Sequence, residues 1–371
     1  LSQGELFPGH EAFMLYDTFG FPLDLTVLMA GEKGLLVDEE EFNNLMDEQR
    51  QRARSSRSTD VHNVQMDLIS DLVAKKTHST FVGYEKTHCK TEILSIIDCN
   101  TILLKETPFY SEGGGQVGDQ GIIKGDGFIF DVTDTQKVAE GIILHIGEIS
   151  LGDPKENMEV IAEVDRYRRG QIRRSHTATH LLNAALRQIV DPSIKQAGSL
   201  VTPERLRFDF NYYEAIPKEL LYQIEQVVNH EIMRNVLIET NEMSLESVKQ
   251  DQNIQAVFDD KYGDIVRVVS IGEFSKELCG GTHVGMTGDI GTFRIISESS
   301  VAAGVRRIEA ITGLEAVSWS SQEHDILTKI SKNLSVKPYE IMDRINTISN
   351  QLKKAEKLSL IHISEPTRPV L

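Results

Sequence analysis

The stretch SHTATHLLNAALRQIV, residues 175–190, sets the fold class of the central part of the chain. Its apolar residues recur at helical spacing, and Ser175 is a favourable N-cap for a helix that begins there. His176 and His180 are four residues apart, so their side chains share one face of this helix, with Cβ atoms about 5–6 Å apart. Both imidazoles can therefore reach a single metal ion.

The sequence after this helix mixes strand and helix patterns without strict alternation. Leu206, Phe208 and Phe210 alternate along a predicted strand, and residues 217–236 form an amphipathic pattern with Pro217 in the first turn. Further strands are expected in DIVRVVSIG (264–272), GTFRIISES (291–299) and VRRIEAITG (305–313). This order predicts an α+β layer sandwich with an antiparallel sheet over residues 166–318.

The regions on either side differ in character, so the chain is predicted to be an α+β multidomain protein. Residues 1–60 have a helical pattern, broken at Gly20 and Pro22, and 55–60 read as a linker. Residues 61–165 alternate short β-rich runs with glycine turns, which indicates a small β-barrel or sandwich, and a barrel is predicted. Residues 319–358 are expected to be C-terminal helices with a coiled-coil-like seam, and residues 359–371 a non-native tail. The seam residues are Ile341, Ile345, Ile348, Leu352 and Ala355.

A glycine-rich stretch, TPFYSEGGGQVGDQG (107–121), lies inside the predicted barrel. Consecutive glycines allow unusual backbone angles or a close approach of the backbone to a neighbour. The stretch lacks the Gly-Lys-Ser/Thr signature of a phosphate-binding loop. It is therefore either a plain turn or a loop that closes over a ligand site.

The bulk composition excludes several classes of protein. A formal net charge of −17 over 371 residues argues against a generic basic nucleic-acid binder. Neither a membrane span nor a signal peptide is expected. With three cysteines in so long a chain, a reducing cytoplasm is the expected location, and Cys89 and Cys99 are expected to be core thiols.

Five arginines lie in the nine residues directly before the first histidine pair. Such a run is either a solvated helix face that pairs with acidic residues or a contact for nucleic-acid phosphates. The arginines are Arg166, Arg168, Arg169, Arg173 and Arg174.

A second pair of metal-ligand residues, Cys279 and His283, lies about a hundred residues after the first. A thiolate and three imidazoles form a set that zinc favours, so one zinc ion per chain is predicted. A zinc protease is disfavoured, because Thr177 stands where that class has its general-base glutamate. Four protein ligands usually make a structural site, so the sequence leaves open whether the zinc is catalytic or structural.

The motifs together resemble the editing half of bacterial alanyl-tRNA synthetases. The resemblance rests on HTATHLLNAALRQ (176–188), KQAGSLV (195–201), ERLRFDF (204–210), ELCGGTHV (277–284), GTFRIISES and AAGVRRIEAITG (302–313). Residues 107–121 resemble the family's glycine-rich barrel motif, with Ser111 in place of an expected proline. Residues 12–26 resemble the end of the aminoacylation and tRNA-recognition region.

The resemblance implies a function and assigns roles to named residues. It implies hydrolysis of tRNA(Ala) mischarged with serine or glycine, with zinc held by His176, His180, Cys279 and His283. It places Gln196 in the editing pocket, suggests Thr179 as the sensor of the serine hydroxyl, and makes Cys279 a catalytic candidate. It also favours tRNA contact by the arginine run.

The resemblance further implies what lies outside this sequence. Nothing in it resembles the class II motifs that bind ATP, so ATP and aminoacylation are expected only of a full-length enzyme, and the chain is expected to be an internal fragment. Oligomerisation is not expected of it. Two alternatives stay open: a zinc-stabilised RNA-binding module without catalysis, and a free-standing trans-editing deacylase, against which residues 1–57 argue.

Overall fold

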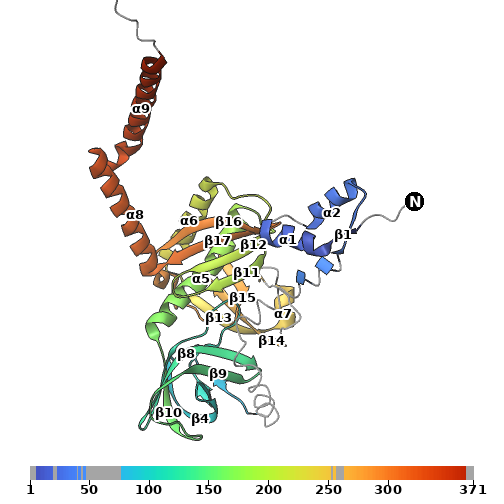
Figure 1. Ribbon diagram of the computed structural model, residues 1–371. Coiled ribbons are helices and arrows are strands. Elements are labelled where there is room, and N and C mark those ends of the chain that lie inside the picture. Colours follow the sequence, from blue (N-terminus) through green and yellow to red (C-terminus); the bar gives the residue numbers. More distant parts are fainter. Residues whose placement is uncertain are drawn as a thin grey trace, which may run out of the picture. The chain divides into compact units, whose positions relative to one another are not determined.

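The computed structural model describes residues 6–19, 23–39, 41–42, 45–46, 77–251, 254–255 and 263–364. The chain divides into two compact units between Thr312 and Gly313, slightly before the boundary expected after residue 318. Helices and strands are mixed, with a closed barrel, several sheets and C-terminal helices (Figure 1). The predicted α+β multidomain fold is therefore confirmed.

The N-terminal segment is a small helical motif with one pair of short strands. Helix α1 spans Gly9–Phe19 and α2 spans Leu23–Glu32, on either side of the predicted break at residues 20–22, which lies outside the described residues. Strands β1 (Leu6–Phe7) and β2 (Leu36–Val37) pair in parallel. The buried Phe42 ring makes edge contacts with Phe13 and Tyr16. The predicted linker at 55–60 also lies outside the described residues.

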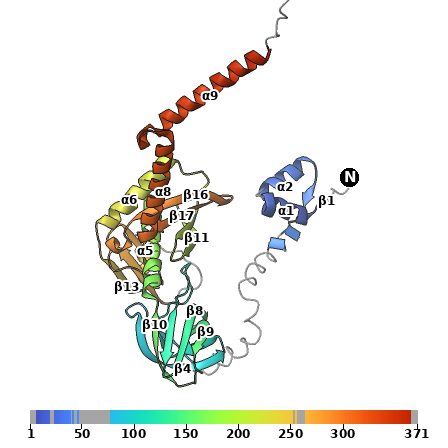
Figure 2. The same cartoon turned by 60° about the vertical axis from the view of Figure 1, so that its left-hand side comes forward.

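A closed barrel follows, with its strands in the order β10-β4-β5-β9-β8-β7 (Figure 2). Its interior is filled by apolar side chains that include Ile93, Phe128 and Phe130. A short parallel pair joins β3 (Thr80–Phe81), which precedes the barrel strands in the sequence, to β6 (Glu106–Thr107), which lies between β5 and β7. The barrel strands are β4 (His88–Asp98), β5 (Thr101–Leu104), β7 (Gly121–Gly125), β8 (Phe128–Ala139), β9 (Ile142–Leu151) and β10 (Glu159–Val164).

The two barrel cysteines differ in their surroundings. Cys89 is buried, as predicted, and packs in the barrel core. Cys99 is exposed, so its prediction as a core thiol is wrong. It lies in the tight turn between β4 and β5, where the Asn100 amide bonds to the Asp98 carboxylate, and such turns face solvent.

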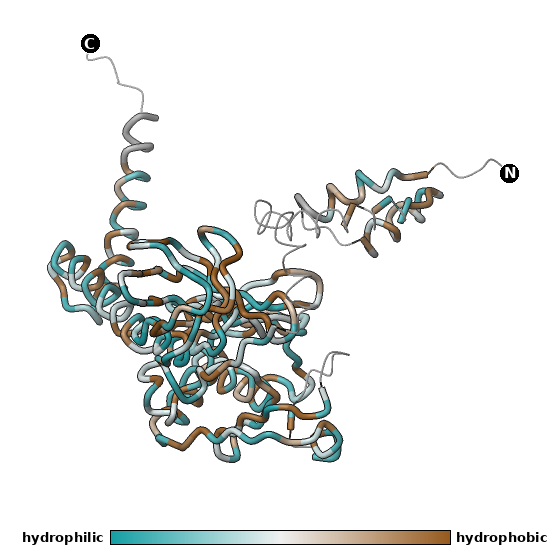
Figure 3. The backbone as a smooth tube through the Cα atoms, turned by 90° about the horizontal axis from the view of Figure 1, so that it is seen from below, coloured by the Kyte–Doolittle hydropathy of each residue, from teal (hydrophilic) through white to brown (hydrophobic). Residues whose placement is uncertain are grey.

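The central region contains a four-stranded antiparallel sheet in the order β11-β12-β17-β16. Helices α5 and α6 pack against it, and the predicted inward residues of β12, Leu206, Phe208 and Phe210, are fully buried there. Hydrophobic and hydrophilic residues are interspersed along the backbone of the described part of the chain (Figure 3). The elements are α5 (Arg166–Ile189), β11 (Gln196–Val201), β12 (Leu206–Asn211), α6 (Lys218–Met233), β16 (Phe293–Ala302) and β17 (Val305–Thr312).

A second, three-stranded sheet in the order β13-β14-β15 leads into the loop that carries Cys279 and His283. Its strands are antiparallel, and the loop begins directly after β15. The elements are β13 (Ile238–Ser244), α7 (Leu245–Gln250), β14 (Ile265–Ile271), β15 (Ser275–Leu278) and the 3₁₀ turn η1 (Thr287–Ile290).

Helix α5 begins earlier than the sequence analysis predicts. Its N-cap is Asp165, whose carboxylate accepts hydrogen bonds from the amides of Tyr167 and Arg168. Ser175 lies in the middle of the helix, buried, with its hydroxyl 3.3 Å from that of Thr312. The prediction of Ser175 as the cap is therefore wrong, because the arginine run is itself helical.

The second compact unit consists of α8 (Gly313–Leu334), the 3₁₀ turn η2 (Pro338–Glu340) and α9 (Ile341–Ser364). Of the predicted seam, Ile341 is buried, whereas Ile345, Ile348 and Leu352 are exposed in the single chain. Helix α9 continues into the segment predicted to be a non-native tail, and residues 365–371 lie outside the described part. Among the described helices, none is long and apolar enough to cross a membrane.

Candidate metal centre

The four predicted ligands come together in the structure. His176 and His180 lie on α5, and Cys279 and His283 on the loop after β15, with one ligand atom of each within 4.8 Å of all the others. The Cys279 Sγ atom lies 3.3 Å from the Nε2 atoms of both His176 and His283. This is close to the roughly 3.5 Å between ligand atoms that a tetrahedral zinc site requires.

The loop reaches the helix because of its second glycine. A Cβ atom on Gly281 would lie 2.0 Å from Cε1 of His176 and 3.0 Å from Oε1 of Gln116, whereas one on Gly280 would meet no atom within 4 Å. Only a residue without a side chain lets the loop backbone pass this close to the imidazole. Gly281 is thus required by packing, and Gly280 is not.

The first imidazole, that of His176, is fixed by a residue of the barrel. Its Nδ1 lies 2.7 Å from Oε1 of Gln116, which is fully buried. The same oxygen accepts a hydrogen bond from the Thr282 amide at 3.0 Å, which identifies it as the carbonyl end of the side chain. Nδ1 of His176 is therefore the donor, and its Nε2 keeps a free lone pair.

The second imidazole, that of His180, is fixed by a carboxylate. Its Nδ1 lies 2.6 Å from Oε2 of Glu277, and Oε1 of Glu277 accepts from Asn183 at 2.9 Å. A carboxylate behind a ligating histidine orients the ring and increases its basicity. Nε2 of His180 is buried and makes no hydrogen bond within the described part of the chain. A buried ring nitrogen that has no partner and is aimed into such a cluster is suited to bind a metal ion.

The third imidazole, that of His283, also has an acceptor for the hydrogen on its Nδ1 atom. Its Nδ1 lies 3.2 Å from Oγ1 of Thr177, whose hydroxyl hydrogen is given to the Arg173 carbonyl at 2.8 Å. The threonine oxygen is therefore an acceptor, and Nδ1 of His283 donates to it. All three rings thus carry hydrogen on Nδ1 and direct Nε2 to the cluster, a donor set that fits zinc.

Electrostatics favour the ligating form of the thiol. Burial by itself raises the pKa of Cys279, but the surrounding imidazoles of His176, His283 and His180 hold it well below its ordinary value. Burial lowers the pKa of His283 to about 3, so this ring is neutral. Burial also opposes protonation of His180, yet Glu277 and the thiolate raise its pKa well above the usual range. Metal binding at this ring would displace a proton.

The ligand loop is held by its backbone as well. Nη1 of Arg267 donates to the carbonyls of Cys279 and Gly281, both at 2.9 Å, and the Tyr84 hydroxyl donates to the Gly280 carbonyl at 2.7 Å. The Arg267 guanidinium lies 4.2 Å from the Tyr84 ring centroid, a cation–π contact. Three consecutive carbonyls are thereby fixed, one of them by Tyr84 from the segment between β3 and β4.

The predicted pocket residues lie on neighbouring elements. Thr179 is buried on α5 between His176 and His180, and its hydroxyl donates to the Ser175 carbonyl at 2.9 Å. Gln196 is the first residue of β11 and is half-buried, with its Nε2 donating to the Ser199 hydroxyl at 3.2 Å. Their roles towards a substrate remain proposals.

The five arginines of the run do not share one environment. Arg169 is 1% exposed, and its guanidinium pairs with the buried Asp119 and donates to the carbonyls of Gly83 and Pro108. Its surroundings give it an internal, structural role. The other four are at least partly accessible, and each has a polar contact within the protein: Arg166 with His88, Arg168 with Gly118, Arg173 with Gly83, and Arg174 with Asp289.

Two residues of the centre, Gln116 and Glu277, were missed by the sequence analysis. Glu277 lies within the quoted ELCGGTHV motif, and its place two residues before Cys279 was a usable signal for a carboxylate behind a ligand. Gln116 follows the three glycines. Its contact with His176 shows that the glycine-rich loop lies against the cluster of the four side chains.

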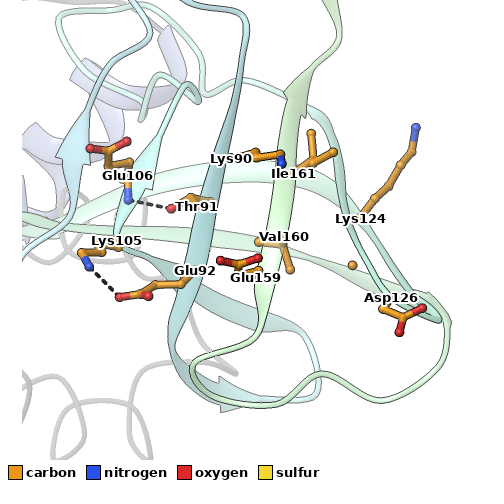
Figure 4. A pocket seen from close by; sticks show the side chains of 11 residues that line it. Lys90, Thr91, Glu92, Lys105, Glu106, Lys124, Asp126, Glu159, Val160 and Ile161 are labelled. Atoms are coloured by element: carbon orange, nitrogen blue, oxygen red, sulfur yellow. Dashed lines mark hydrogen bonds and ion pairs between the residues drawn. The ribbon is translucent and has the colours of Figure 1, made fainter.

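A separate hollow lies on the barrel and is open to solvent. Its volume is about 560 Å³, and a Lys105–Glu92 ion pair of 2.8 Å forms part of its lining (Figure 4). Lysines and carboxylates of mixed sign line it, so it offers no strong field for a ligand of one charge. The lining residues are Lys90, Thr91, Glu92, Lys105, Glu106, Lys124, Gly125, Asp126, Glu159, Val160 and Ile161.

Two family models match the chain. The model described as "tRNA synthetases class II (A)" matches residues 1–168, and "Threonyl and Alanyl tRNA synthetase second additional domain" matches residues 266–309, which include Cys279 and His283. The first match covers the N-terminal helical segment and the barrel together.

Curated relatives match nearly all of the chain. An alanine–tRNA ligase of Carboxydothermus hydrogenoformans is 45% identical over 94% of the chain and 41% of its own length. Those of Petrotoga mobilis and Legionella pneumophila (strain Corby) are 41% and 42% identical, over 94% and 98% of the chain and 41% and 43% of their lengths. The chain thus spans about two-fifths of the length of these relatives, and by its sequence it belongs to the alanyl-tRNA synthetase family.

Proposed function

We propose that this chain carries an editing activity that hydrolyses tRNA(Ala) mischarged with serine or glycine at the His176–His180–Cys279–His283 centre. The convergence of these four ligand atoms supports the proposal most, because it lies in a chain that belongs to a synthetase family. A pocket built for alanine admits glycine and rejects one added hydroxyl only modestly. A second site that hydrolyses the wrongly charged tRNA would remove these errors.

In this proposal the four side chains hold one zinc ion. Bound zinc would act as a Lewis acid that polarises the ester carbonyl or a water molecule. Gln116, Glu277 and Thr177 would hold the three imidazoles so that their Nε2 atoms and the Cys279 thiolate point to one position. Preorganisation of this kind leaves little to rearrange when the substrate arrives.

Thr179 is suited to recognise the serine side chain. Its hydroxyl hydrogen is already given to the Ser175 carbonyl, so its oxygen is available as an acceptor. The hydroxyl of a misacylated serine can donate to it, and glycine cannot. Gln196 has an amide oxygen that can accept from the substrate's ammonium group. Of the arginine run, Arg166 and Arg174 are the candidates for phosphate contact that positions the tRNA.

The direct test follows the deacylation of seryl-, glycyl- and alanyl-tRNA(Ala) by this chain and by Cys279→Ala. We expect release of serine and glycine, sparing of alanine, and loss of release in the variant. Cys99→Ala is the matched control, since this cysteine is exposed in a turn. A folded, zinc-loaded chain that binds tRNA but releases no amino acid would reduce the site to a zinc-stabilised RNA-binding module.

Thr179→Val separates recognition from chemistry. Loss of one hydrogen bond to the serine hydroxyl should slow serine release about five- to tenfold and leave glycine release nearly unchanged. Equal slowing with both substrates would assign Thr179 to packing.

We also propose that the chain binds tRNA, that a longer protein containing it makes alanyl-tRNA, and that it is located in the cytoplasm. The class II match over residues 1–168 favours the synthetase context over a free-standing editor.

A further inference from the structure

Two residues outside the α+β region contact the four clustered side chains or their loop: Tyr84, which lies between β3 and β4, and Gln116, which lies between β6 and β7. Gln116 contacts His176 and Thr282, and the Tyr84 hydroxyl donates to the Gly280 carbonyl. These residues lie in the region before α5, whereas all four ligands lie in the region that begins with α5. The immediate surroundings of the metal centre are therefore shared by two parts of the chain.

The Gln116 side chain is placed as part of a built site. It is fully buried, and each of its polar atoms is used: Oε1 accepts from the Thr282 amide and from His176, and Nε2 donates to the Thr282 hydroxyl at 3.0 Å. Without this acceptor the Nδ1–H of His176 would be buried and unsatisfied, or the ring would turn. In either case the ring would no longer be held with Nε2 of His176 directed to the cluster.

The loop that carries Gln116 is anchored on both sides. The Val201 amide at the end of β11 donates to the Gly115 carbonyl at 2.7 Å, and Val201 in turn accepts from the Val117 amide at 3.2 Å. Gly115 has φ of +83°, and a Cβ atom there would lie 2.3 Å from the Ser199 hydroxyl oxygen. The glycine-rich stretch thus lies against β11 and delivers Gln116 to the metal ligands.

We propose that Gln116 is a positioning residue through which docking of the barrel and binding of zinc favour each other. The barrel fixes the tautomer and orientation of His176, and a bound metal ion fixes the same ring from its other side. Because such coupling is reciprocal, loss of the Gln116 contact weakens the metal, and loss of the metal loosens the glycine-rich loop. The inference rests on the proposed zinc site and not on hydrolysis.

The test measures zinc affinity of the full chain by competition with a chromophoric chelator. Gln116→Ala should lower the affinity about 10- to 100-fold, the range seen when a partner behind a ligating histidine is removed. Gln120→Ala is the matched control, because Gln120 lies on the same loop and bonds to the Thr133 carbonyl. It should bind zinc as the unaltered chain does.

Two further readouts exclude a general loss of packing. In the unaltered chain, zinc should increase the hydrogen-exchange protection of residues 113–117, and Gln116→Ala should abolish this zinc-linked increase. The visible spectrum of the cobalt(II)-loaded variant should also depart from that of the unaltered chain, since it reports the ligand geometry. Tyr84→Phe gives a milder variant at a partly exposed site and should weaken zinc about two- to tenfold.

The zinc affinity and the cobalt spectrum separate the role of Gln116 from the existence of the zinc site. Unchanged zinc affinity and an unchanged cobalt spectrum in folded Gln116→Ala would overturn the inference and leave the zinc site standing. A chain that binds no zinc in any form would overturn both the inference and the proposed site. Weakened zinc together with lost loop protection would establish the coupling whether or not the chain hydrolyses seryl-tRNA.

Discussion

At the scale of single residues, the proposed metal centre depends on which nitrogen of each histidine carries hydrogen. Gln116, Glu277 and Thr177 each take up an Nδ1–H, so three Nε2 atoms face the thiol of Cys279. None of these three partners is a ligand. The ligands alone could be read from the spacing of histidine and cysteine, whereas all three partners lie far in the sequence from the histidines that they contact.

The two glycines of the ligand loop give a sharp test at this scale. Gly281→Ala places a methyl group against the His176 ring, and Gly280→Ala places one in open space. We expect Gly281→Ala to lose about 1–3 kcal/mol of stability through overpacking and to weaken zinc. Gly280→Ala should leave the zinc affinity nearly unchanged. Zinc titration and urea unfolding of both variants check this, and equal effects would contradict the geometry.

At the scale of elements, α5 connects the barrel to the proposed metal centre. Arg169 on its first turns forms a buried ion pair with Asp119, fifty residues away in the chain. Downstream on the same helix are His176 and His180. The sequence of α5 shows the positive charge of its arginine run and the helical spacing of its two histidines. It could not show that one of five similar arginines lies in the interior, because its partner is remote in sequence.

Arg169→Leu should therefore act on stability and not on RNA binding. Removing one partner of a buried pair leaves Asp119 uncompensated, which costs about 3–5 kcal/mol. Arg166→Leu, at an exposed position, should cost little. Urea unfolding compares the two variants, and the salt dependence of tRNA binding shows which arginine meets phosphate. A stable Arg169→Leu protein with a reduced salt slope would reverse this assignment.

The barrel has its own titratable group in His145 on β9. Burial lowers its pKa to about 4; its ring contacts the Thr107 hydroxyl at 2.7 Å and the Ile102 carbonyl at 3.1 Å. The folded state stays neutral while the unfolded state gains a proton below pH 6.5. Stability is therefore complete above that pH and falls by up to about 3 kcal/mol towards pH 4.

The pH dependence of unfolding checks this assignment. His145→Gln removes the titrating group, so the difference in stability between pH 7 and pH 4 should shrink relative to the unaltered chain. His324→Gln, at an exposed position of α8, serves as the control and should keep the full difference. An unchanged difference in His145→Gln would show that other groups cause the acid sensitivity.

At the scale of the whole molecule, the sequence predicted the classes of the parts better than their connections. The barrel, the antiparallel sheet and the C-terminal helices follow from local periodicity, since alternation and helical spacing are properties of short stretches. The start of α5 at Arg166 and the exposure of Cys99 did not follow, because a helix cap and a turn depend on one or two residues. That Gln116 meets the four clustered side chains could be seen only in the three-dimensional structure, because these residues are far apart in the sequence.

The measurement that tests the central claim most directly is serine release from seryl-tRNA(Ala) before and after zinc is stripped and restored. The unaltered chain is treated with a chelator, its folding is checked, and zinc is then added back. We predict that release is lost on stripping, returns with zinc, and spares alanyl-tRNA throughout. Full-rate release by the folded, metal-free chain would contradict a metal-dependent editing centre. So would zinc-loaded protein that binds the tRNA and leaves seryl-tRNA intact.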